Sequence, residues 1–353
     1  MPESPDLPTP DAPPPDPSAP GAAPLDPHAP VPLTPDEAAA HGERCTRLLD
    51  DLGGVVLGQD DMLEQMLVTL VAGGHALIEG VPGTAKTLAI RGLSRALKTS
   101  FGRIQFTPDL MPTDVTGVNI LDEVARAFVF QQGPIFADLL LADEINRAPA
   151  KTQAALLEAM EERQVTVDGV SHQLPAAFSV FASQNPVEYE GTYPLPEAQL
   201  DRFLIKILVD YPAEEAEVAI LDRHAAGFDA ADPETFGLDA GLDREALLTL
   251  RRDARRVRLD PELRRYVVAL VRRTRQDPSL ALGASPRASV SLSRASQARA
   301  LVEGRDYVVP EDVKSMAIPA LRHRVMLTAE AEVEGVTADA RVAAVVDSVE
   351  APR

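Results

Sequence analysis

Several features are scarce or absent in this chain of 353 residues: it has one cysteine, no tryptophan, and no lysine or arginine before Arg44. A single thiol, Cys45, can form neither an internal disulfide nor a cysteine-based zinc site, and such scarcity fits a reducing compartment. No run approaches the roughly 18 apolar residues of a membrane-spanning helix. The N-terminus lacks the basic and apolar segments of a secretory signal. We therefore expect a cytoplasmic protein with no membrane span.

Basic charge is also in short supply. Asp and Glu number 54 against 34 Lys and Arg, which gives a formal net charge of −20. Because binding to a nucleic-acid backbone depends on clustered Lys and Arg, we expect no nucleic acid as the main partner. Apolar residues make up 45% of the chain, enough for the core of one large or two ordinary domains.

Proline is in excess, with 31 residues that are concentrated near the N-terminus. Residues 1–34 consist mainly of Pro, Ala, Asp and Ser, a composition that cannot bury much apolar surface. We therefore predict an extended, disordered tail over residues 1–34. A proline-rich ligand for an SH3-like partner is the alternative interpretation.

Helix and strand patterns alternate over residues 35–212. Thr34-Pro35-Asp36-Glu37 is typical of a helix start, and further helices are predicted over residues 59–72 and 86–97. Strands are predicted over residues 75–79, 104–106, 127–130, 139–142, 179–183 and 205–209. This alternation predicts an α/β core with a mostly parallel sheet.

Helical patterns alone follow from residue 213. Helices are predicted over residues 214–224, 243–256, 261–274, 286–303 and 310–323, with no strand between them. We therefore expect a separate all-α domain over residues 213–330. Residues 331–353 are expected to be a C-terminal tail or a frayed helix.

A glycine-containing loop joins the strand over residues 75–79 to the helix that follows it. The loop and helix start read Gly80-Val81-Pro82-Gly83-Thr84-Ala85-Lys86-Thr87. Backbone N–H groups of such a loop wrap phosphates, Lys86 reaches the β- and γ-phosphates, and the Thr87 hydroxyl ligates Mg²⁺. Ala85 replaces the usual glycine, which is acceptable if this residue has helical backbone angles. The pattern predicts a site for ATP and Mg²⁺.

Polar residues close two of the predicted strands. Asp143 and Glu144 end an apolar strand; in P-loop ATPases the first such acid holds Mg²⁺ and the second polarises the attacking water. Asn185 follows the strand over residues 179–183, at the edge where ligands bind in open α/β sheets. It could orient the water, and Asn185-Pro186 also fits a turn.

Together these motifs resemble the AAA+ module of the MoxR family. The segments that carry the resemblance are Glu-Gly-Val-Pro-Gly-Thr-Ala-Lys-Thr, Leu-Ala-Asp-Glu-Ile-Asn-Arg-Ala-Pro-Ala-Lys-Thr-Gln, Ala-Ser-Gln-Asn-Pro and Pro-Glu-Ala-Gln-Leu-Asp-Arg-Phe. The resemblance extends over about residues 35–325, and Ala85 is the residue usual in this family. It implies a P-loop AAA+ core, an all-α lid, and Mg²⁺-dependent hydrolysis of ATP to ADP and phosphate.

The resemblance also implies a role for each site residue. The matching positions are Lys86 and Thr87 for Walker A, Asp143 and Glu144 for Walker B, Asn185 for sensor 1, and Gly58 and Gln59 for the approach to the adenine.

Arginine positions carry the remaining roles. Arg202 matches the finger that reaches the γ-phosphate of a neighbouring subunit, although it could instead pair with Glu197 or Asp201 at a helix end. Arg147, close to Glu144, is a competing candidate for the finger. Arg287 matches sensor 2, which would report closure of the lid over ATP bound between core and lid, or could be an ordinary charge in a first helical turn.

Two insertions fit the same family. Residues 164–174 alternate around Asp168-Gly169, a hairpin signal, and resemble the pre-sensor-1 hairpin. Residues 112–130 resemble the helix-2 insert. In related machines these loops face the ring pore or the substrate.

The function implied by the resemblance is that of a ring-shaped homo-oligomer, with six subunits expected. It would act as a chaperone that remodels or activates protein partners, often von Willebrand A domain proteins or metalloprotein complexes. The alternatives are an ATP-switched scaffold with little turnover, a helicase loader, and a chelatase-like motor subunit. Glu144 and Arg202 argue against the scaffold, and the charge of −20 argues against the loader.

Overall fold

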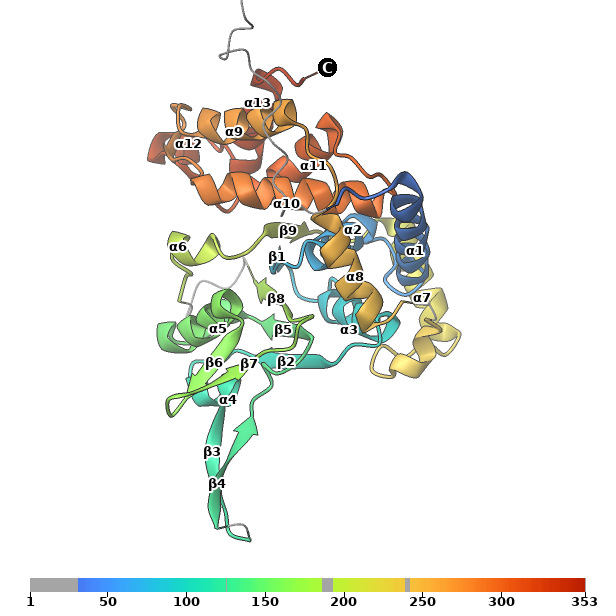
Figure 1. Cartoon of the computed structure of the whole chain (residues 1–353), viewed down its shortest axis with the longest axis vertical. Helices are drawn as coiled ribbons and strands as arrows, with labels where there is room; N and C mark the ends of the chain where they lie inside the picture. Colours follow the sequence, from blue (N-terminus) through green and yellow to red (C-terminus); the bar gives the residue numbers. More distant parts are fainter. Residues whose placement is uncertain (1–30, 125, 186–192, 239–241, 353) are drawn as a thin grey trace, which may run out of the picture. The chain divides into compact units, whose positions relative to one another are not determined.

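A five-stranded, wholly parallel sheet lies at the centre of the computed structural model, which describes residues 31–124, 126–185, 193–238 and 242–352. The strands are β1 (Ala76–Gly80), β2 (Phe101–Gln105), β5 (Leu139–Asp143), β8 (Ser179–Gln184) and β9 (Ile205–Val209). Their order is β2-β5-β8-β1-β9 (Figure 1). The predicted α/β fold with a parallel sheet is confirmed. Residues 1–30 of the predicted tail lie outside the described residues.

Both faces of this sheet are covered, so its central strands are apolar at nearly every position. In β5, Leu139 and Leu141 belong to one buried cluster, whereas Leu140 and Ala142 belong to another. This division follows from the alternation of side chains along a strand. Near-continuous apolar runs of this kind are typical of parallel strands buried on both faces.

Four helices flank the strands of the core. They are α1 (Pro35–Gly53), α2 (Asp60–Val71), α3 (Lys86–Ala96) and α5 (Ala150–Glu162). The predicted start of the first helix is confirmed, because the Glu37 amide donates to the Thr34 hydroxyl at 3.3 Å and the Thr34 amide donates to the Glu37 carboxylate at 2.9 Å. Cys45 is buried in α1, and burial raises the pKa of its thiol to about 12.

Two antiparallel hairpins depart from the sheet. After the short α4 (Pro112–Thr116), β3 (Gly117–Asp122) and β4 (Ala127–Gln132) pair with each other and project away from the core (Figure 1). The strand predicted over residues 127–130 exists but is not part of the parallel sheet. The second hairpin, β6 (Gln164–Val167) and β7 (Val170–Gln173), confirms the prediction: Asp168 and Gly169 have φ of 50° and 82°, as a primed turn requires.

The C-terminal part is mostly helical. After the short α6 (Glu197–Leu200), which precedes β9, its helices are α7 (Glu214–Ala225), α8 (Arg244–Ala254), α9 (Pro261–Thr274), α10 (Pro286–Val302), α11 (Pro310–Leu321), α12 (Ala329–Val333) and α13 (Ala338–Ser348). Two short strands that the sequence did not predict, β10 (Leu280–Leu282) and β11 (Met326–Leu327), form a small ladder. The end of the chain differs from the expected tail or frayed helix, because α13 buries Val342 and Val345 while packing against α9 and α11.

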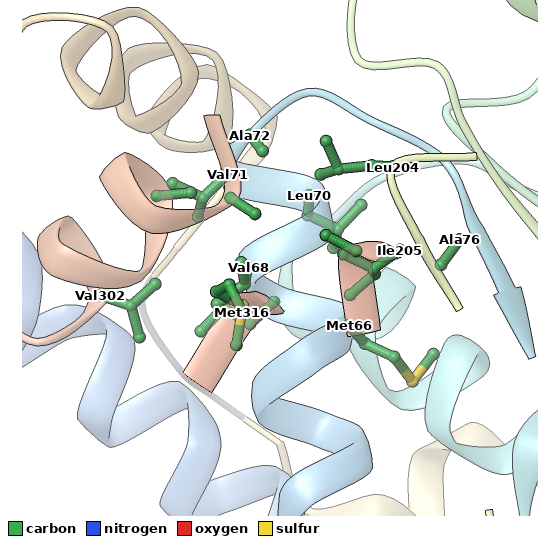
Figure 2. Packing of buried hydrophobic residues seen from close by; sticks show 14 of the residues in the cluster. Met66, Val68, Leu70, Val71, Ala72, Ala76, Leu204, Ile205, Val302 and Met316 are labelled. Carbon is green, nitrogen blue, oxygen red and sulfur yellow. The ribbon is translucent and has the colours of Figure 1, made fainter. Parts of the chain in front are cut away.

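The C-terminal helices share a core with the sheet domain. Val68 of α2 and Ile205 of β9 lie in one buried cluster with Val302 at the end of α10 and Met316 of α11 (Figure 2). The boundary proposed at residue 212 therefore falls within a continuous apolar core, and it stays a prediction. None of the helices in the described part of the chain is long and apolar enough to cross a membrane.

Acid should destabilise this fold through His75, which precedes β1. Its ring is buried, and Nδ1 accepts a hydrogen bond from the Val180 amide at 2.9 Å. Burial, with a smaller effect of Arg163, lowers the pKa of His75 to about 3. The unfolded chain binds a proton near pH 6.5 and the folded chain does not, so stability falls as pH decreases below 6.5.

Between pH 7.5 and pH 5.5 we expect His75 to account for a loss of about 1.4 kcal/mol in the free energy of unfolding. Denaturant titrations at the two pH values measure this loss. The variant His75→Asn keeps an acceptor for the Val180 amide but cannot titrate, so its pH dependence should be smaller by that amount. An unchanged pH dependence in the variant would contradict the assignment.

Candidate functional site

The loop between β1 and α3 encloses the ammonium group of Lys86. Its Nζ donates to the backbone carbonyls of Gly80 and Val81, at 2.7 Å each. Burial lowers the pKa of Lys86, whereas the nearby charges of Asp143 and Glu144 favour its protonated form. Lys86 lies at the start of α3, where the helix N-terminus favours anions. The loop, the ammonium and the helix thus form a local positive site within an acidic chain.

Backbone geometry explains the residue types in this loop. Gly83 has a φ of 86°, a left-handed value that glycine adopts without strain. A Cβ atom on Gly80 would lie 2.4 Å from the Val209 carbonyl oxygen of the neighbouring strand, so no side chain fits there. Ala85 has a φ of 60° and a ψ of 15°. The expectation of ordinary helical angles at Ala85 is therefore wrong: the residue is left-handed, which costs an alanine about 1 kcal/mol.

Two acidic side chains face the loop from the end of β5. Asp143 accepts a hydrogen bond from the Ser183 hydroxyl at 2.5 Å and one from Arg103 at 2.7 Å. Glu144 accepts from Gln105 at 2.9 Å and from Arg147 at 3.1 Å. These hydrogen bonds hold both carboxylates in place. Each carboxylate accepts at least one of them from a side chain on a strand next to β5.

Sequence reasoning missed Arg103, Gln105 and Ser183. The first two lie on β2 and the third on β8, the strands on either side of β5. Gln105 pairs in register with Asp143, about forty residues away in sequence. Only the strand order brings these residues together. Ser183 lies in the Ala-Ser-Gln-Asn-Pro segment, but no local motif marks Arg103 or Gln105.

The predicted phosphate-binding residues converge on one cavity. The cavity has a volume of about 630 Å³ and is lined by Gly80, residues 82–88, Asp143, Glu144 and Asn185, together with residues of neighbouring segments. Gly58 and Gln59 are not in its lining, and Gln59 donates to the carbonyl of Asp210, just beyond β9, at 3.0 Å. The structure thus brings the Walker-type residues together and leaves the predicted adenine residues out of the lining.

This donor set fits magnesium. Asp143 offers a carboxylate and Thr87 a hydroxyl, and Mg²⁺ in nucleotide sites takes few protein oxygens together with phosphates and water. In the described residues, no group of three or more His, Cys, Asp or Glu side chains is arranged to hold a metal ion. A magnesium ion here would therefore also need oxygens from phosphate and water. The Ser183 hydrogen bond directs one oxygen of Asp143 and so orients the carboxylate.

Arg202 and Arg287 lie in a different cavity. Both contact the carboxylate of Glu161, at 3.0 Å and 2.5 Å, and both line a cavity of about 620 Å³ together with Gly74 and His75. Because Gly74 and His75 precede β1 and the phosphate loop follows it, the two cavities lie at opposite edges of the sheet. A strand of five residues separates them by about 16 Å. The resemblance had implied that Arg287 reports lid closure over ATP bound between core and lid. In the structure, Arg287 does not lie at the nucleotide cavity of its own subunit.

Arg324 fixes the turn that carries Arg202. This buried guanidinium donates to the Asp201 carboxylate at 2.6 Å and to the Phe203 carbonyl at 2.6 Å. Arg202 itself pairs with Glu161 rather than with Asp201 or Glu197. Arg324 belongs to the segment after α11, so the C-terminal helices hold the arginine in position. Its role has no sequence signal, because arginines are frequent in this half of the chain.

Comparisons with known proteins relate the chain to ATPases. The family described as "ATPase family associated with various cellular activities (AAA)" matches residues 75–205, and an AAA lid domain matches residues 272–345. YeaC of Bacillus subtilis is 46% identical over 87% of this chain and 94% of its own length. Chaperone MoxR1 of Mycobacterium tuberculosis is 43% identical over 89% of this chain and 84% of its own. The crystal structure of a candidate ATPase from Cytophaga hutchinsonii superposes with a TM-score of 0.83 at 38% identity, covering 90% of this chain and 98% of that one.

Replacing Ala85 with glycine should relieve the left-handed strain at the phosphate loop. We expect Ala85→Gly to raise the free energy of unfolding by up to about 1 kcal/mol, with part of the gain offset by the more flexible unfolded chain. The matched control is Gly83→Ala, where a Cβ meets nothing within 4 Å and only the backbone is strained, so stability should fall. Denaturant titration of both variants measures the effects. A lower free energy of unfolding in Ala85→Gly would contradict the conclusion that the backbone at Ala85 is strained.

Proposed function

Because the chain belongs to the MoxR family of AAA+ ATPases, we propose that it hydrolyses ATP to ADP and phosphate with Mg²⁺ and uses this cycle to act on protein partners in the cytoplasm. The observation that carries the proposal is the convergence of Lys86, Asp143 and Glu144 on one cavity. A phosphate loop, a carboxylate for a metal and a second carboxylate for water are the groups that this reaction needs.

Each group has a defined task in the proposed reaction. Lys86 and the N-terminus of α3 bind the β- and γ-phosphates, and the loop amides orient the chain of phosphates. Asp143 and Thr87 would hold Mg²⁺, which supplies charge neutralisation on the phosphate oxygens. Glu144 takes a proton from the attacking water as it approaches the γ-phosphorus in line, and Asn185 orients that water.

One oxygen of Glu144 is already engaged in the structure. This oxygen, Oε2, accepts hydrogen bonds from both Gln105 and Arg147. The other oxygen accepts no hydrogen bond from the described residues, so it is the one that would take the proton from water. Gln105 is in this sense a positioning residue that orients the Glu144 carboxylate.

Glu144→Gln should bind ATP normally and hydrolyse it slowly. Loss of the proton acceptor is expected to reduce turnover by about 10²- to 10⁴-fold, because general-base catalysis contributes this much. Phosphate release and equilibrium binding of a nucleotide probe measure the two effects separately. Glu158→Gln, an exposed position on α5, serves as the control and should behave as wild type. Equal and slow turnover in Glu144→Gln and wild type, with ATP binding intact, would support the scaffold alternative instead.

The position of Arg202 and Arg287 supports a ring. They lie at the edge of the sheet opposite the phosphate loop, which supports the proposal that they act on the nucleotide of another copy rather than on that of their own subunit. A head-to-tail contact gives a ring when its rotation closes, and we propose a closed ring of six subunits from the family resemblance. A guanidinium supplied by the neighbour would neutralise charge that spreads over the transferring phosphoryl oxygens.

Two inactive variants should restore each other. A subunit with Arg202→Ala keeps Glu144, and a subunit with Glu144→Gln keeps Arg202, so mixed assemblies contain interfaces with both groups intact. In a random mixture about a quarter of the interfaces are complete, and turnover should rise toward that fraction. Steady-state phosphate release after coexpression measures it.

Arg147→Ala provides the matched comparison for this experiment. Arg147 contacts Glu144 within its own subunit, so mixing Arg147→Ala with Glu144→Gln should restore nothing. Recovery with Arg147→Ala and none with Arg202→Ala would reverse the assignment of the finger.

The β3–β4 hairpin is the proposed contact for protein partners. Its end exposes large apolar side chains, with Val124 at 96% and Phe128 at 75% accessibility. Exposed apolar groups of this size commonly mark binding sites for other proteins. We propose that partners, including those with von Willebrand A domains, are engaged here.

Replacing Val124 and Phe128 with serine should remove partner binding without affecting basal hydrolysis, because neither residue lines the nucleotide cavity. Assemblies of Glu144→Gln held with ATP, with and without the serine pair, can be compared for the proteins that they retain. Proteins retained only by the intact hairpin are the expected result. Identical retention by both would contradict a role of the hairpin.

A further inference from the structure

The cavity at the edge opposite the phosphate loop carries more positive charge than the proposed reaction uses. Five arginines line it, and its lining includes two carboxylates, Glu161 and Asp201. Glu161 is engaged by Arg202 and Arg287, and Asp201 by Arg324. The other three arginines, Arg163, Arg255 and Arg294, have no carboxylate partner within the described ranges.

These three arginines are held close together. Arg163 donates to the carbonyls of Phe178 and Gly73, and Arg294 donates to that of Ala72, so both are anchored by the backbone and remain charged. Burial lowers the pKa of Arg294, and the charges of Arg255 and Arg163 lower it further. Arg255 is exposed, and its guanidinium makes no hydrogen bond in the described part of the chain. Like charges fixed at one place repel each other, and an anionic group would relieve the repulsion.

The opposite edge of the sheet carries the complementary charge on α7. This helix has no buried side chain, although it follows β9 directly. Its first turn contains Glu214, Glu215 and Glu217. It also exposes apolar side chains, with Leu221 at 70% and Val218 at 53% accessibility. A helix with an acidic start and an uncovered apolar surface is incomplete in the isolated chain.

Helix α7 is followed by a loop that lines the nucleotide cavity, and the three arginines line the same cavity as Arg202 and Arg287. A nucleotide site shared between two copies would need both cavities. The loop after α7 contributes Ala230 and Ala231 to the lining of the nucleotide cavity. In Figure 1, α7 lies on the right of the sheet, and α5 and α6, whose ends contribute to the arginine cavity, lie on the left.

We propose that the acidic first turn of α7 docks into the arginine cavity of a second copy of this chain, where Arg163, Arg255 and Arg294 receive its carboxylates. The exposed Val290 of α10, at the rim of that cavity, would then face the apolar side chains of α7. This contact rests on the proposed ring and specifies its register. Opposite charges orient the two surfaces and exclude reversed docking, while the apolar groups contribute affinity.

Charge reversal at Arg255 tests the contact. Arg255→Glu changes an exposed side chain outside the proposed reaction, and it should weaken assembly at least tenfold in the concentration at half-assembly. Sedimentation velocity with ATP, in the Glu144→Gln background, measures this concentration at low and high salt. Arg265→Glu on α9 is the control with the same change of net charge and should assemble like the parent. Thermal melting confirms that each variant is folded.

Restoration by a second reversal gives the decisive result. Arg255→Glu is combined in turn with Glu214→Arg, Glu215→Arg and Glu217→Arg, and at least one combination should recover assembly to within about threefold of the parent. Assembly of Arg255→Glu at the parent's concentration, or no recovery in any combination, would overturn the docking.

These outcomes are separable from those of the proposed function. A wild-type chain that binds and hydrolyses ATP, while Arg255→Glu assembles like its Glu144→Gln parent, would overturn only the docking. A parent chain that binds no ATP would overturn the ATPase, whatever its assembly. A parent that never assembles with ATP would overturn the ring and the docking together.

Discussion

The parallel direction of all five strands is the constraint on which the rest of the structure depends. Because every strand runs the same way, the phosphate loop after β1, the acids after β5 and Asn185 after β8 meet at one edge. The neighbouring strands then supply the second layer, in which Ser183 orients Asp143 and Gln105 holds Glu144. If one of the central strands were antiparallel, the residue after it would lie at the opposite edge, one strand length away from the other groups.

The same constraint makes the two edges chemically different. The edge at the carboxyl ends collects two acids, a lysine, two arginines and a helix N-terminus, whereas the edge at the amino ends collects five arginines and only two carboxylates. Arg324 connects the second edge to the C-terminal helices through Asp201 and the Phe203 carbonyl. Movement of those helices would therefore be transmitted to the turn that carries Arg202, with the sheet as the fixed reference.

The sequence allowed the fold to be predicted well wherever a local pattern carried the information. Apolar runs marked four of the five strands, whereas β2 (Phe101–Gln105) overlaps the strand predicted over residues 104–106 by only two residues. The Thr34 capping box marked a helix start, and Asp168-Gly169 marked a hairpin turn. The β10–β11 ladder was missed because strands of three and two residues are too short to show a period. Buried valines of α13 were also missed, because their packing surface comes from distant helices.

The candidate site was only partly predictable for the same reason. Lys86, Asp143 and Glu144 belong to local motifs, so they could be found without knowing the strand order. Arg103, Gln105 and Ser183 needed that order, and the position of Arg287 needed the packing of α10. The left-handed Ala85 shows a further limit, since a residue type alone does not report a backbone angle that its neighbours impose.

Separation of the nucleotide cavity from the arginines has a consequence for partly built assemblies. If each site is completed by the next copy, an open row of subunits always has one nucleotide cavity without arginines at one end. At the other end it has one set of arginines with no nucleotide to serve. The number of complete sites is then one fewer than the number of subunits until the row closes, and closure activates the last site without any change within a subunit. The rate of ATP hydrolysis per subunit would therefore be lower in a short open row, where the incomplete site is a larger share of all sites, than in a closed ring.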